Sequence, residues 1–442
     1  MKKIGIIHFR IGLTDGVSLE INKRKKILER MGNKVITIGG KESKKADYYI
    51  KGLDFDSVIS RYWRNKFFDT ESKTKYKKRV FNKDIEYIEK QLEEVFLKEN
   101  FDIVFIHNLF SLAAHPTATL ATKNIIKKNP QIKFILVNHD YYWERNYSRK
   151  PKSLKASKFC EENLPIEGKN VINCSINKSA QKELLRFKNI QSLVIGDTFD
   201  FKKKHFNKKT LKEYKELRKK LNIKEEDIVF LQATRIVPRK AIELSIDFIA
   251  ELNKQKEDVF KNYKNILGKK SNKNSQLYLV FSNFVEKSEK KYLELLKKHA
   301  TEKKVTLLFA RTKEINKKYD FWDFYNIADF VTYPSIKEGW GNQFLELVAA
   351  RKLGIIFEYP VFSSDIKPLR TKQVILAKKY NRDKKDKRVK VDKQDMEKAV
   401  KQFKRYIKDP QNLKKTLDNN LKIVRKHHDL AALERHLKKI VN

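Results

Sequence analysis

A chain of 442 residues in which 40% are hydrophobic and 11% aromatic is not wholly disordered, and 35% charged residues exclude a protein that is mostly embedded in a membrane. Its length exceeds what one hydrophobic core usually organises, so it predicts two domains of roughly 200 residues each. The formal net charge of +44 favours nucleic acid, an anionic membrane surface or phosphorylated small molecules as partners, but lysine recurs on nearly every predicted helix, which favours a compositional bias as its main cause.

The N-terminal stretch MKKIGIIHFRIG is predicted to be a buried strand rather than a signal peptide. His8 and Arg10 interrupt its apolar run, and no small-residue cleavage site follows. No uninterrupted apolar segment approaches the roughly 18 residues that a membrane span needs. The two cysteines, Cys160 and Cys174, form neither a metal-ligand spacing nor a CxxC motif. We therefore expect a cytoplasmic protein, free or in peripheral contact with the inner membrane surface.

Short apolar runs alternate with helical patterns along the first half of the chain. The runs lie at residues 3–9, 34–38, 101–107, 133–139, 171–176 and 192–196. Near-continuous apolar runs are typical of parallel strands buried on both faces, and intervening segments such as 18–32 have helical spacing. This half therefore predicts a helix-covered parallel sheet. The segment 40–82 has aromatic residues amid charge and no clean period, so we interpret it as an insertion whose role the sequence does not assign.

A second series of apolar runs follows a lysine-rich linker near residues 196–208. These runs lie at residues 227–234, 276–282, 304–310, 329–334 and 353–359, and the last part of the chain, residues 396–442, is predicted to be helical throughout. The sequence thus predicts an α/β protein with two tandem Rossmann-like, doubly wound domains, at 1–200 and 201–425, and a C-terminal helix within 426–442.

In doubly wound sheets, ligands bind at the carboxyl ends of the strands, where helix N-termini favour anions. After the first strand, Gly12 and Gly16 bracket a turn in which Thr14 and Asp15 can cap the next helix. The turn is neither a GxGxxG nor a Walker loop. A phosphate-binding loop and a plain tight turn both explain it.

After the fourth strand, His139 and Asp140 are followed by Tyr142, Trp143 and Arg145. A histidine in this position can hydrogen-bond a sugar or act in acid–base chemistry, or it can be satisfied by a loop carbonyl. Tyr142 and Trp143 can stack on a sugar face, although packing between a loop and its domain is their more common use.

The second domain has Arg235 directly after its first strand and Lys240 five residues later, with Pro238 before a helical pattern. Two cations at a strand-to-helix junction can hold a diphosphate and offset the charge that builds on it as it leaves. Two solvated residues among 99 basic ones are the alternative, and position alone favours that alternative.

The stretch PSIKEGWGNQFLELVAARK, residues 334–352, places Glu338 and Glu346 around a Gly-Trp-Gly. A strand precedes it and a helix is predicted from residue 342, so Glu338 precedes the helix and Glu346 lies two turns inside it. Carboxylates accept hydrogen bonds from hydroxyls, so such a pair suits a sugar and a ribose. A purely structural helix start is the alternative.

These features together resemble the family 4 retaining glycosyltransferases of the GT-B fold. The resemblance rests on Glu-x7-Glu after a strand that ends in Pro-Ser, Arg-x4-Lys at the head of the second domain, the Gly-rich first loop and the histidine after a middle strand. It covers nearly the whole chain. It implies two Rossmann-like domains with a cleft between them, of which the N-terminal one faces the acceptor and the C-terminal one binds the nucleotide sugar. It also implies that the last helix, near 428–441, crosses back onto the first domain.

The resemblance implies a role for each candidate residue. Arg235 and Lys240 would hold the donor diphosphate, Glu338 the hydroxyls of the transferred sugar, and Glu346 the ribose. The implied catalytic set is His139, Glu338, Arg235 and Lys240. The implied donor-binding set is Gly12, Gly16, Arg235, Lys240, Arg311, Glu338, Gly339, Trp340, Gly341, Asn342 and Glu346. The implied acceptor-binding set is Asp140, Tyr142, Trp143 and Arg145. Two positions depart from the family pattern: the usual Gly-Gly of the first loop is Thr-Asp-Gly, and the usual Lys-Gly is Lys240-Ala241.

The implied reaction moves a hexose from a nucleoside diphosphate sugar, with GDP-mannose or UDP-glucose favoured, to a hydroxyl of a sugar, a glycolipid or a small anionic acceptor. The anomeric configuration is kept by a front-face mechanism that needs neither a metal nor another cofactor. One alternative is a basic nucleic-acid-binding protein, although the sequence lacks a recognisable motif for a specific nucleic acid. Another is a membrane-surface glycosyltransferase that acts on lipid-linked acceptors.

Overall fold

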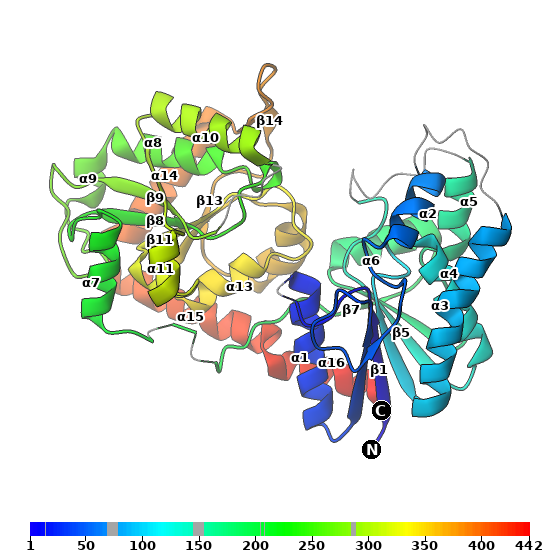
Figure 1. Cartoon of the computed structure of the whole chain (residues 1–442). Helices are drawn as coiled ribbons and strands as arrows, with labels where there is room; N and C mark the ends of the chain where they lie inside the picture. The colour runs from blue at the N-terminus through cyan, green and yellow to red at the C-terminus, as the bar shows by residue number, and fades with distance from the viewer. Residues whose placement is uncertain (14, 69–77, 145–153, 204, 207, 284–288) are drawn as a thin grey trace. The chain divides into compact units, whose positions relative to one another are not determined.

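The computed structural model divides the chain into two compact units (Figure 1). Unit 1 comprises Met1–Thr198 and Leu430–Asn442, and unit 2 comprises Phe199–Asp429. The structure describes residues 1–13, 15–68, 78–144, 154–203, 205–206, 208–283 and 289–442. Each unit is a parallel sheet with helices packed on it, as the sequence predicts.

Unit 1 contains a seven-stranded sheet in the order β3-β2-β1-β4-β5-β6-β7, and each neighbouring pair is parallel. Its strands are β1 (Lys3–His8), β2 (Lys34–Gly39), β3 (Tyr48–Tyr49), β4 (Ile103–His107), β5 (Lys133–Asn138), β6 (Val171–Ser175) and β7 (Leu193–Val194). Its helices are α1 (Gly16–Arg30), α2 (Val58–Phe68), α3 (Lys78–Glu99), α4 (Pro116–Lys128), α5 (Leu154–Asn163), α6 (Lys178–Lys188) and α16 (Leu430–Val441).

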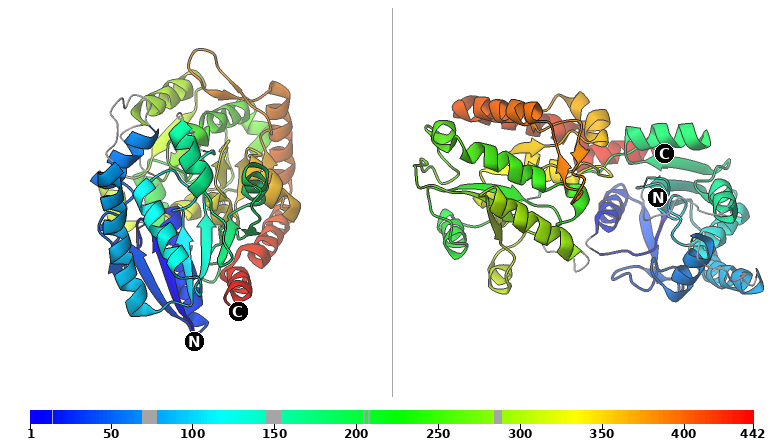
Figure 2. Two further views of the ribbon diagram at one scale, coloured as in Figure 1. Left: turned by 90° about the vertical axis from the view of Figure 1, so that its right-hand side faces the viewer. Right: turned by 90° about the horizontal axis from the view of Figure 1, so that it is seen from above.

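Helices lie on both faces of the sheet in unit 1 (Figure 2), and a cluster of buried apolar side chains packs against each face. On one face, alternate residues such as Ile7 and Ile38 pack against α2, α3, α4 and α5. On the other face, Ile4 and Ile6 pack against α1 and α16. Both faces of the strands are thus buried, which explains why the strands read as continuous apolar runs.

Unit 2 contains a six-stranded parallel sheet in the order β10-β9-β8-β11-β12-β13 and a separate two-stranded hairpin, β14-β15. Its strands are β8 (Ile228–Gln232), β9 (Leu277–Phe281), β10 (Thr306–Phe309), β11 (Phe330–Tyr333), β12 (Leu353–Ile356), β13 (Val374–Ile375), β14 (Asn381–Arg382) and β15 (Val389–Lys390). Its helices are α7 (Leu211–Lys220), α8 (Glu243–Asn253), α9 (Lys256–Phe260), α10 (Lys290–Glu302), α11 (Lys313–Lys318), α12 (Asp323–Ile327), α13 (Asn342–Ala349), α14 (Lys393–Lys408) and α15 (Pro410–His428), with short turns of helix η1 (Pro238–Lys240), η3 (Phe362–Ile366) and η4 (Lys367–Leu369).

The topology of unit 2 brings two loops together at one edge of its sheet. Strands β8 and β11 are parallel neighbours, so the segments that follow them, at residues 233–241 and 334–341, leave the same edge. A backbone hydrogen bond of 3.1 Å from Ile336 N to Arg239 O joins these segments. Among the described residues, none of the helices is both long enough and apolar enough to cross a membrane.

Candidate active site

Glu338 is a buried carboxylate held between two cations of unit 2. Its side chain is 8% exposed, and its Oε1 accepts a hydrogen bond from the Lys240 ammonium. Its Oε2 accepts from Arg239 Nη1 at 2.7 Å, and the same guanidinium nitrogen donates to Lys337 O at 2.9 Å. The structure therefore joins the two halves of the predicted donor site, which lie about a hundred residues apart in the chain.

Electrostatics keep Glu338 ionised in spite of its burial. Burial alone would raise the pKa of this carboxyl, but Lys240 and Arg239 outweigh that effect and lower the pKa to about 2. The pKa of Lys240 is also lowered, chiefly by burial and secondarily by Arg239 and Arg235, while Glu338 opposes the shift. The ammonium also lies 5.6 Å from the ring centre of Tyr333. The cluster therefore carries a net positive charge, because two cations flank one carboxylate.

The Arg-x4-Lys loop brings its residues to the carboxyl end of β8. Arg235 is exposed, whereas Lys240 ends η1 and is only 7% exposed. Ala241, at which the sequence departs from the glycine that the family resemblance implies, has a left-handed φ of 45°. Glycine adopts that conformation without strain, so the backbone at this position would suit a glycine.

The Gly-Trp-Gly turn leads into the N-terminus of α13. Gly341 has a φ of +116°, and a Cβ at this position would lie 2.2 Å from Tyr359 Oη, so only glycine fits without rearrangement. The N-cap residue of α13 is Gly341, which has no side chain to cap the backbone N–H groups at the start of the helix. Asn342 Oδ1 is buried there without a hydrogen-bond partner among the described residues. A buried acceptor beside uncapped N–H groups is suited to a ligand that both donates and accepts hydrogen bonds.

Of two further predicted donor-binding residues, Trp340 is buried and Arg311 is partly exposed. The Trp340 ring is 2% exposed and packs on His428 of α15, with 4.5 Å between ring centres, so what remains for a ligand is the backbone of residues 339–342. Arg311 follows β10, where its guanidinium lies 5.8 Å from the ring centre of Phe324 and donates to Tyr319 O at 3.5 Å. Burial lowers the pKa of Arg311.

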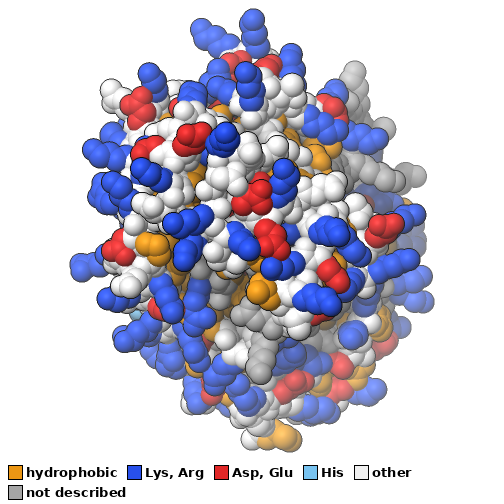
Figure 3. Space-filling model, turned by 90° about the vertical axis from the view of Figure 1, so that its left-hand side faces the viewer, with side chains coloured by type: hydrophobic (Ala, Val, Ile, Leu, Met, Phe, Trp, Pro, Cys, Tyr) orange, Lys and Arg blue, Asp and Glu red, His pale blue; other side chains and the backbone are white. Residues whose placement is uncertain are grey.

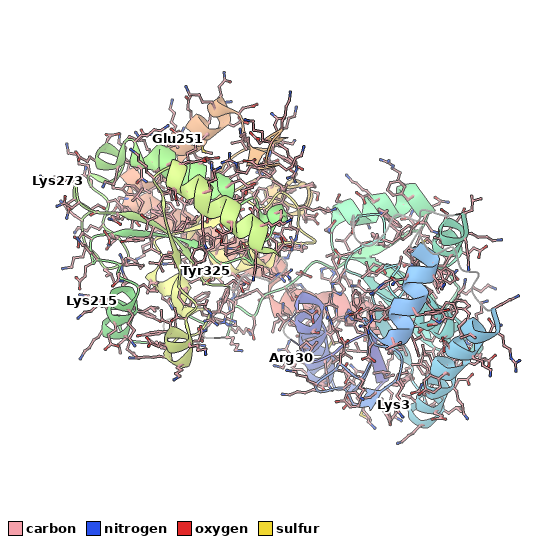
Figure 4. All side chains as sticks on the ribbon, turned by 45° about the horizontal axis from the view of Figure 1, so that its top comes forward. Lys3, Arg30, Lys215, Glu251, Lys273 and Tyr325 are labelled. Carbon is pink, nitrogen blue, oxygen red and sulfur yellow. The ribbon has the colours of Figure 1, made fainter. Side chains whose placement is uncertain are left out.

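Glu346 lies on α13 and is oriented by a tyrosine from α12. The helix begins at Asn342, so Glu346 is one turn inside it rather than the two turns expected from the sequence. Its Oε2 accepts a hydrogen bond from Tyr325 Oη at 2.7 Å. Tyr325 is fully buried in the interior of unit 2, whereas Lys215 and Lys273 extend outward from it (Figure 4).

The first loop of unit 1 begins at the carboxyl end of β1. Gly12 has a φ of +76°, and a Cβ there would come within 3.2 Å of the Lys45 backbone. Gly16 is the first residue of α1, and Asp15 caps this helix because its Oδ1 accepts from Ser18 N at 3.2 Å. The cap predicted at Asp15 is thus present, and Thr14 lies outside the described residues.

His139 follows β5 and is 7% exposed. Its backbone N–H donates to Asn108 Oδ1 at 2.8 Å, and its Nε2 lies 2.9 Å from His107 Nδ1. The two imidazole rings are stacked, with 5.2 Å between centres. The ring of His139 therefore contacts another histidine, which ends the neighbouring strand, and the backbone of His139 contacts the loop residue Asn108.

The aromatic residues after His139 take part in packing. Trp143 stacks on buried Tyr141 with 4.6 Å between ring centres, and its Nε1 donates to Glu183 at 3.0 Å. Tyr142 packs against the core of unit 1, and Asp140 is partly exposed. Arg145 lies outside the described residues.

Several residues of these clusters were not identified from the sequence. Arg239 is one of 99 basic residues, although its position beside Lys240 in the same loop was a usable signal. His107, Asn108 and Tyr325 lie in or beside apolar runs, where their burial matches that of core residues. Among the described residues, no group of three or more His, Cys, Asp and Glu side chains is arranged to hold a metal ion.

Comparison with protein families relates this arrangement to known proteins. The sequence model described as "Glycosyl transferases group 1" matches residues 213–423, which contain Arg235, Lys240, Glu338 and Glu346. A protein of Petrotoga mobilis named mannosylglucosylglycerate synthase is 38% identical over 423 residues, which are 93% of this chain and 94% of that protein. A protein of the same name from Thermotoga maritima is 36% identical over 438 residues, with 98% of each chain covered.

Solved structures share the two-unit fold at low sequence identity. A glycosyltransferase from Rickettsia africae matches with a TM-score of 0.62 and 15% identity, over 99% of this chain and 97% of that one. A sucrose-phosphate synthase from Thermosynechococcus elongatus matches with a TM-score of 0.60 and 13% identity, over 100% and 98% of the two chains. These likenesses confirm the predicted fold class.

Proposed function

This chain belongs to the glycosyl transferases group 1 family, and from that premise we propose that it transfers a mannosyl unit from GDP-mannose to glucosylglycerate. The family makes it a glycosyltransferase that uses a nucleotide-sugar donor and a carbohydrate acceptor. We base the proposed substrates on the name of the two relatives. That name describes a product in which a mannosyl unit is joined to glucosylglycerate. Glucosylglycerate is a small anionic sugar, and GDP-mannose is one of the two donors that the sequence favours over others.

The observation that carries the proposal is the cluster of Glu338 between Lys240 and Arg239 at the carboxyl end of the sheet in unit 2. Cations that are fixed and partly desolvated bind a diphosphate strongly and stabilise it as it leaves. A diphosphate that engages these cations competes with Glu338 for them. The Glu338 oxygens then become acceptors for the hydroxyls of the transferred sugar.

The proposed mechanism is front-face displacement with retention of the anomeric configuration. Lys240, Arg239, Arg235 and the N-terminus of α13 neutralise the departing diphosphate, which helps to deprotonate the attacking hydroxyl. Because Glu338 is committed to hydrogen bonds, no nucleophilic role is assigned to it. The fixed cations take the part that a divalent metal plays in other transferases, so we propose that the reaction proceeds without one.

We place the acceptor-binding site in unit 1, where two arginines flank an aromatic ring near the end of β1. The guanidinium carbons of Arg10 and Arg64 lie 5.4 and 5.8 Å from the ring centre of Phe55. Arg10 also lies 3.7 Å from Asp15, and Arg64 donates to Asp56 at 2.9 Å. Arg10 is the more exposed arginine, so we assign it to the glycerate carboxylate.

The proposal is tested by incubating the purified protein with GDP-mannose, GDP-glucose, UDP-glucose or UDP-mannose and either glucosylglycerate or uncharged glucosylglycerol. We expect mannosylglucosylglycerate from GDP-mannose, detected by mass spectrometry, with an α-mannosyl signal by NMR because the donor is α-linked. The assay is run with and without EDTA. Transfer only from another donor, transfer to glucosylglycerol alone, or a β-linked product would each contradict the corresponding part of the proposal.

A further inference from the structure

Three neighbouring strands of unit 1 carry histidines at the same edge of the sheet. His8 is the last residue of β1, His107 is the last residue of β4, and His139 directly follows β5. The strand order β1-β4-β5 places them side by side. All three are buried, with exposed fractions of 4%, 0% and 7%. They form a row of hydrogen bonds: His8 Nδ1 to His107 O at 3.0 Å, and His107 Nδ1 to His139 Nε2 at 2.9 Å.

We propose that His107 is a positioning residue that fixes His139 in the tautomer with its proton on Nδ1. This inference rests on the proposed function and on the catalytic role that the family resemblance implies for His139. It adds to that function the direction in which the His139 ring presents its N–H group, together with the residue that determines it.

The first step concerns the charge of His107. Burial lowers its pKa well below the usual histidine value, and His139, Arg24 and His8 lower it further. The ring is therefore neutral and carries one N–H. Because its Nδ1 lies within hydrogen-bond distance of His139 Nε2, exactly one of these two nitrogens donates to the other.

The second step decides which nitrogen donates. Nε2 of His107 is buried and has no hydrogen-bond partner among the described residues. If His139 donated, the single proton of His107 would have to lie on this Nε2, where it would be a buried N–H without an acceptor. Buried N–H groups without a partner are rarer than buried acceptors without one. The proton of His107 therefore lies on Nδ1 and is donated to His139.

The third step follows from the first two. A neutral His139 that accepts through Nε2 carries its own proton on Nδ1. Asn108, which comes directly after His107, holds the His139 backbone N–H at 2.8 Å. Two consecutive residues at the end of β4 thus orient both the backbone and the ring of His139. Asn108 has a left-handed φ of 60°, a conformation that asparagine tolerates well.

The tautomer can be measured without any assay of activity. In protein labelled with ¹⁵N at its histidine rings, we expect His139 to show a protonated Nδ1 and an unprotonated Nε2 near neutral pH. His139→Gln identifies the signal. A wild-type His139 with its proton on Nε2 overturns the proposal, and this result does not depend on whether GDP-mannose is the donor.

Two variants of His107 test the positioning role. His107→Leu removes the donor, so we expect the proton of His139 to move to Nε2 and kcat to fall by roughly tenfold or more while the KM for the sugar nucleotide changes less than twofold. His107→Asn keeps an N–H donor near the place of Nδ1, so we expect it to restore the tautomer and most of the rate. A His107→Leu protein that keeps both the wild-type tautomer and the wild-type kcat overturns the proposal.

His115→Gln is the matched control, because His115 is a buried histidine of the same unit whose Nε2 contacts Gly52 O instead of His139. We expect His139 in this variant to keep the wild-type tautomer. A shift there equal to that in His107→Leu would contradict a specific role for His107. Where His107→Leu fails to fold, the wild-type spectrum and His107→Asn still decide the question. A wild-type protein without transfer activity but with the expected tautomer would contradict the proposed function alone.

Discussion

Burial and two neighbouring cations have opposite effects on the pKa of Glu338. Its pKa is lowered from 4.5 to about 2 because Lys240 and Arg239 outweigh the effect of burial. A carboxyl whose folded-state pKa is depressed contributes stability that is fully present above the unfolded value and is lost as the pH falls toward the folded value. The ion pairs of Glu338 therefore weaken only between about pH 4.5 and pH 2. Burial of Lys240 offsets part of the gain, because it lowers the pKa of that ammonium.

Glu338→Gln tests the catalytic importance of this carboxylate. The amide keeps the shape but loses the charge that holds Lys240 and Arg239, and it replaces one acceptor for sugar hydroxyls with a donor. We expect kcat/KM for transfer to fall by about 100-fold or more, with unchanged circular dichroism. Asp329→Asn is the control, because Asp329 is a buried carboxyl before β11, at the other end of the strand. Near-normal turnover of Glu338→Gln with several donors would rule out the assignment.

Arg10→Gln tests the proposed contact with the acceptor carboxylate. Loss of a charge-assisted hydrogen bond should raise the KM for glucosylglycerate by about tenfold, with little effect on the KM for the donor. The preference for glucosylglycerate over uncharged glucosylglycerol should shrink by a similar factor. Arg61→Gln provides the comparison, because Arg61 lies on α2, pairs with Asp56 and has a half-exposed side chain. If Arg10→Gln retains the full preference for the anionic acceptor, another residue must bind the carboxylate.

At the scale of elements, the strands that lie in apolar runs were predictable, and most of the two-residue strands were not. Each of the apolar runs named from the sequence contains a strand, and most of these strands are buried on both faces and must therefore be apolar throughout. Strands β3, β13, β14 and β15 have two residues each, which is too short for any periodicity, whereas the equally short β7 lies within the apolar run 192–196. The segment 40–82 reads as an irregular insertion because its burial is concentrated in a few residues, such as Trp63 and Phe67 of α2.

The candidate site likewise contains residues that were predictable from the sequence and residues that were not. Glu338 and Lys240 were predictable because they lie in loops after strands, within spacings that a known family shares. Arg239 was missed although it stands beside Lys240 in the same loop, and His107 was not predictable, because its importance depends on a contact across neighbouring strands that no local pattern encodes. Pairings of this kind become visible only once the strand order is known.

The junction of β11 with α13 depends on the backbone of Gly341. Gly341→Ala places a methyl group 2.2 Å from Tyr359 Oη and forces alanine to a φ of +116°. We expect a loss of at least about 1–3 kcal/mol in the free energy of unfolding, together with weaker binding of GDP because the start of α13 shifts. Urea unfolding and calorimetric titration measure the two effects.

The double variant Gly341→Ala/Tyr359→Phe separates the two causes. Removing the Tyr359 hydroxyl relieves the shortest contact but neither the backbone strain nor the 2.8 Å contact of the methyl group with Tyr333 Oη, so we expect recovery of only part of the lost stability relative to Tyr359→Phe alone. Full recovery would show that the strained φ costs nothing, and no recovery would show that the hydroxyl is not what opposes the methyl group.

At the scale of the whole molecule, the positive charge is spread rather than localised. Lysine and arginine side chains are scattered over the face seen in Figure 3, among acidic and uncharged ones. Distributed charge attracts polyanions without selecting a site, and salt screens that attraction readily. This distribution favours compositional bias as the origin of the net charge and leaves recognition of anions to specific clusters such as the one around Lys240.

The path of the chain makes unit 1 depend on its last residues. After unit 2 ends at Asp429, α16 belongs to unit 1, where Leu433 and Leu437 pack in the same apolar cluster as Ile21 and Leu28 of α1. Stability of unit 1 therefore requires a segment that is synthesised only after unit 2. Because burial of apolar side chains is the main favourable term, truncating one of them should destabilise the unit that contains it.

Leu437→Ala tests this dependence. Leu437 is fully buried, so we expect the free energy of unfolding of unit 1 to fall by about 2–5 kcal/mol. Hydrogen exchange followed by mass spectrometry should then show faster exchange in α1 and β1 but not in β8 or β9. Leu296→Ala, which truncates an equally buried leucine of α10, should give the reverse pattern. If Leu437→Ala instead accelerates exchange in unit 2, or in neither unit, then α16 does not stabilise unit 1, because the cost of the cavity must appear where the leucine packs.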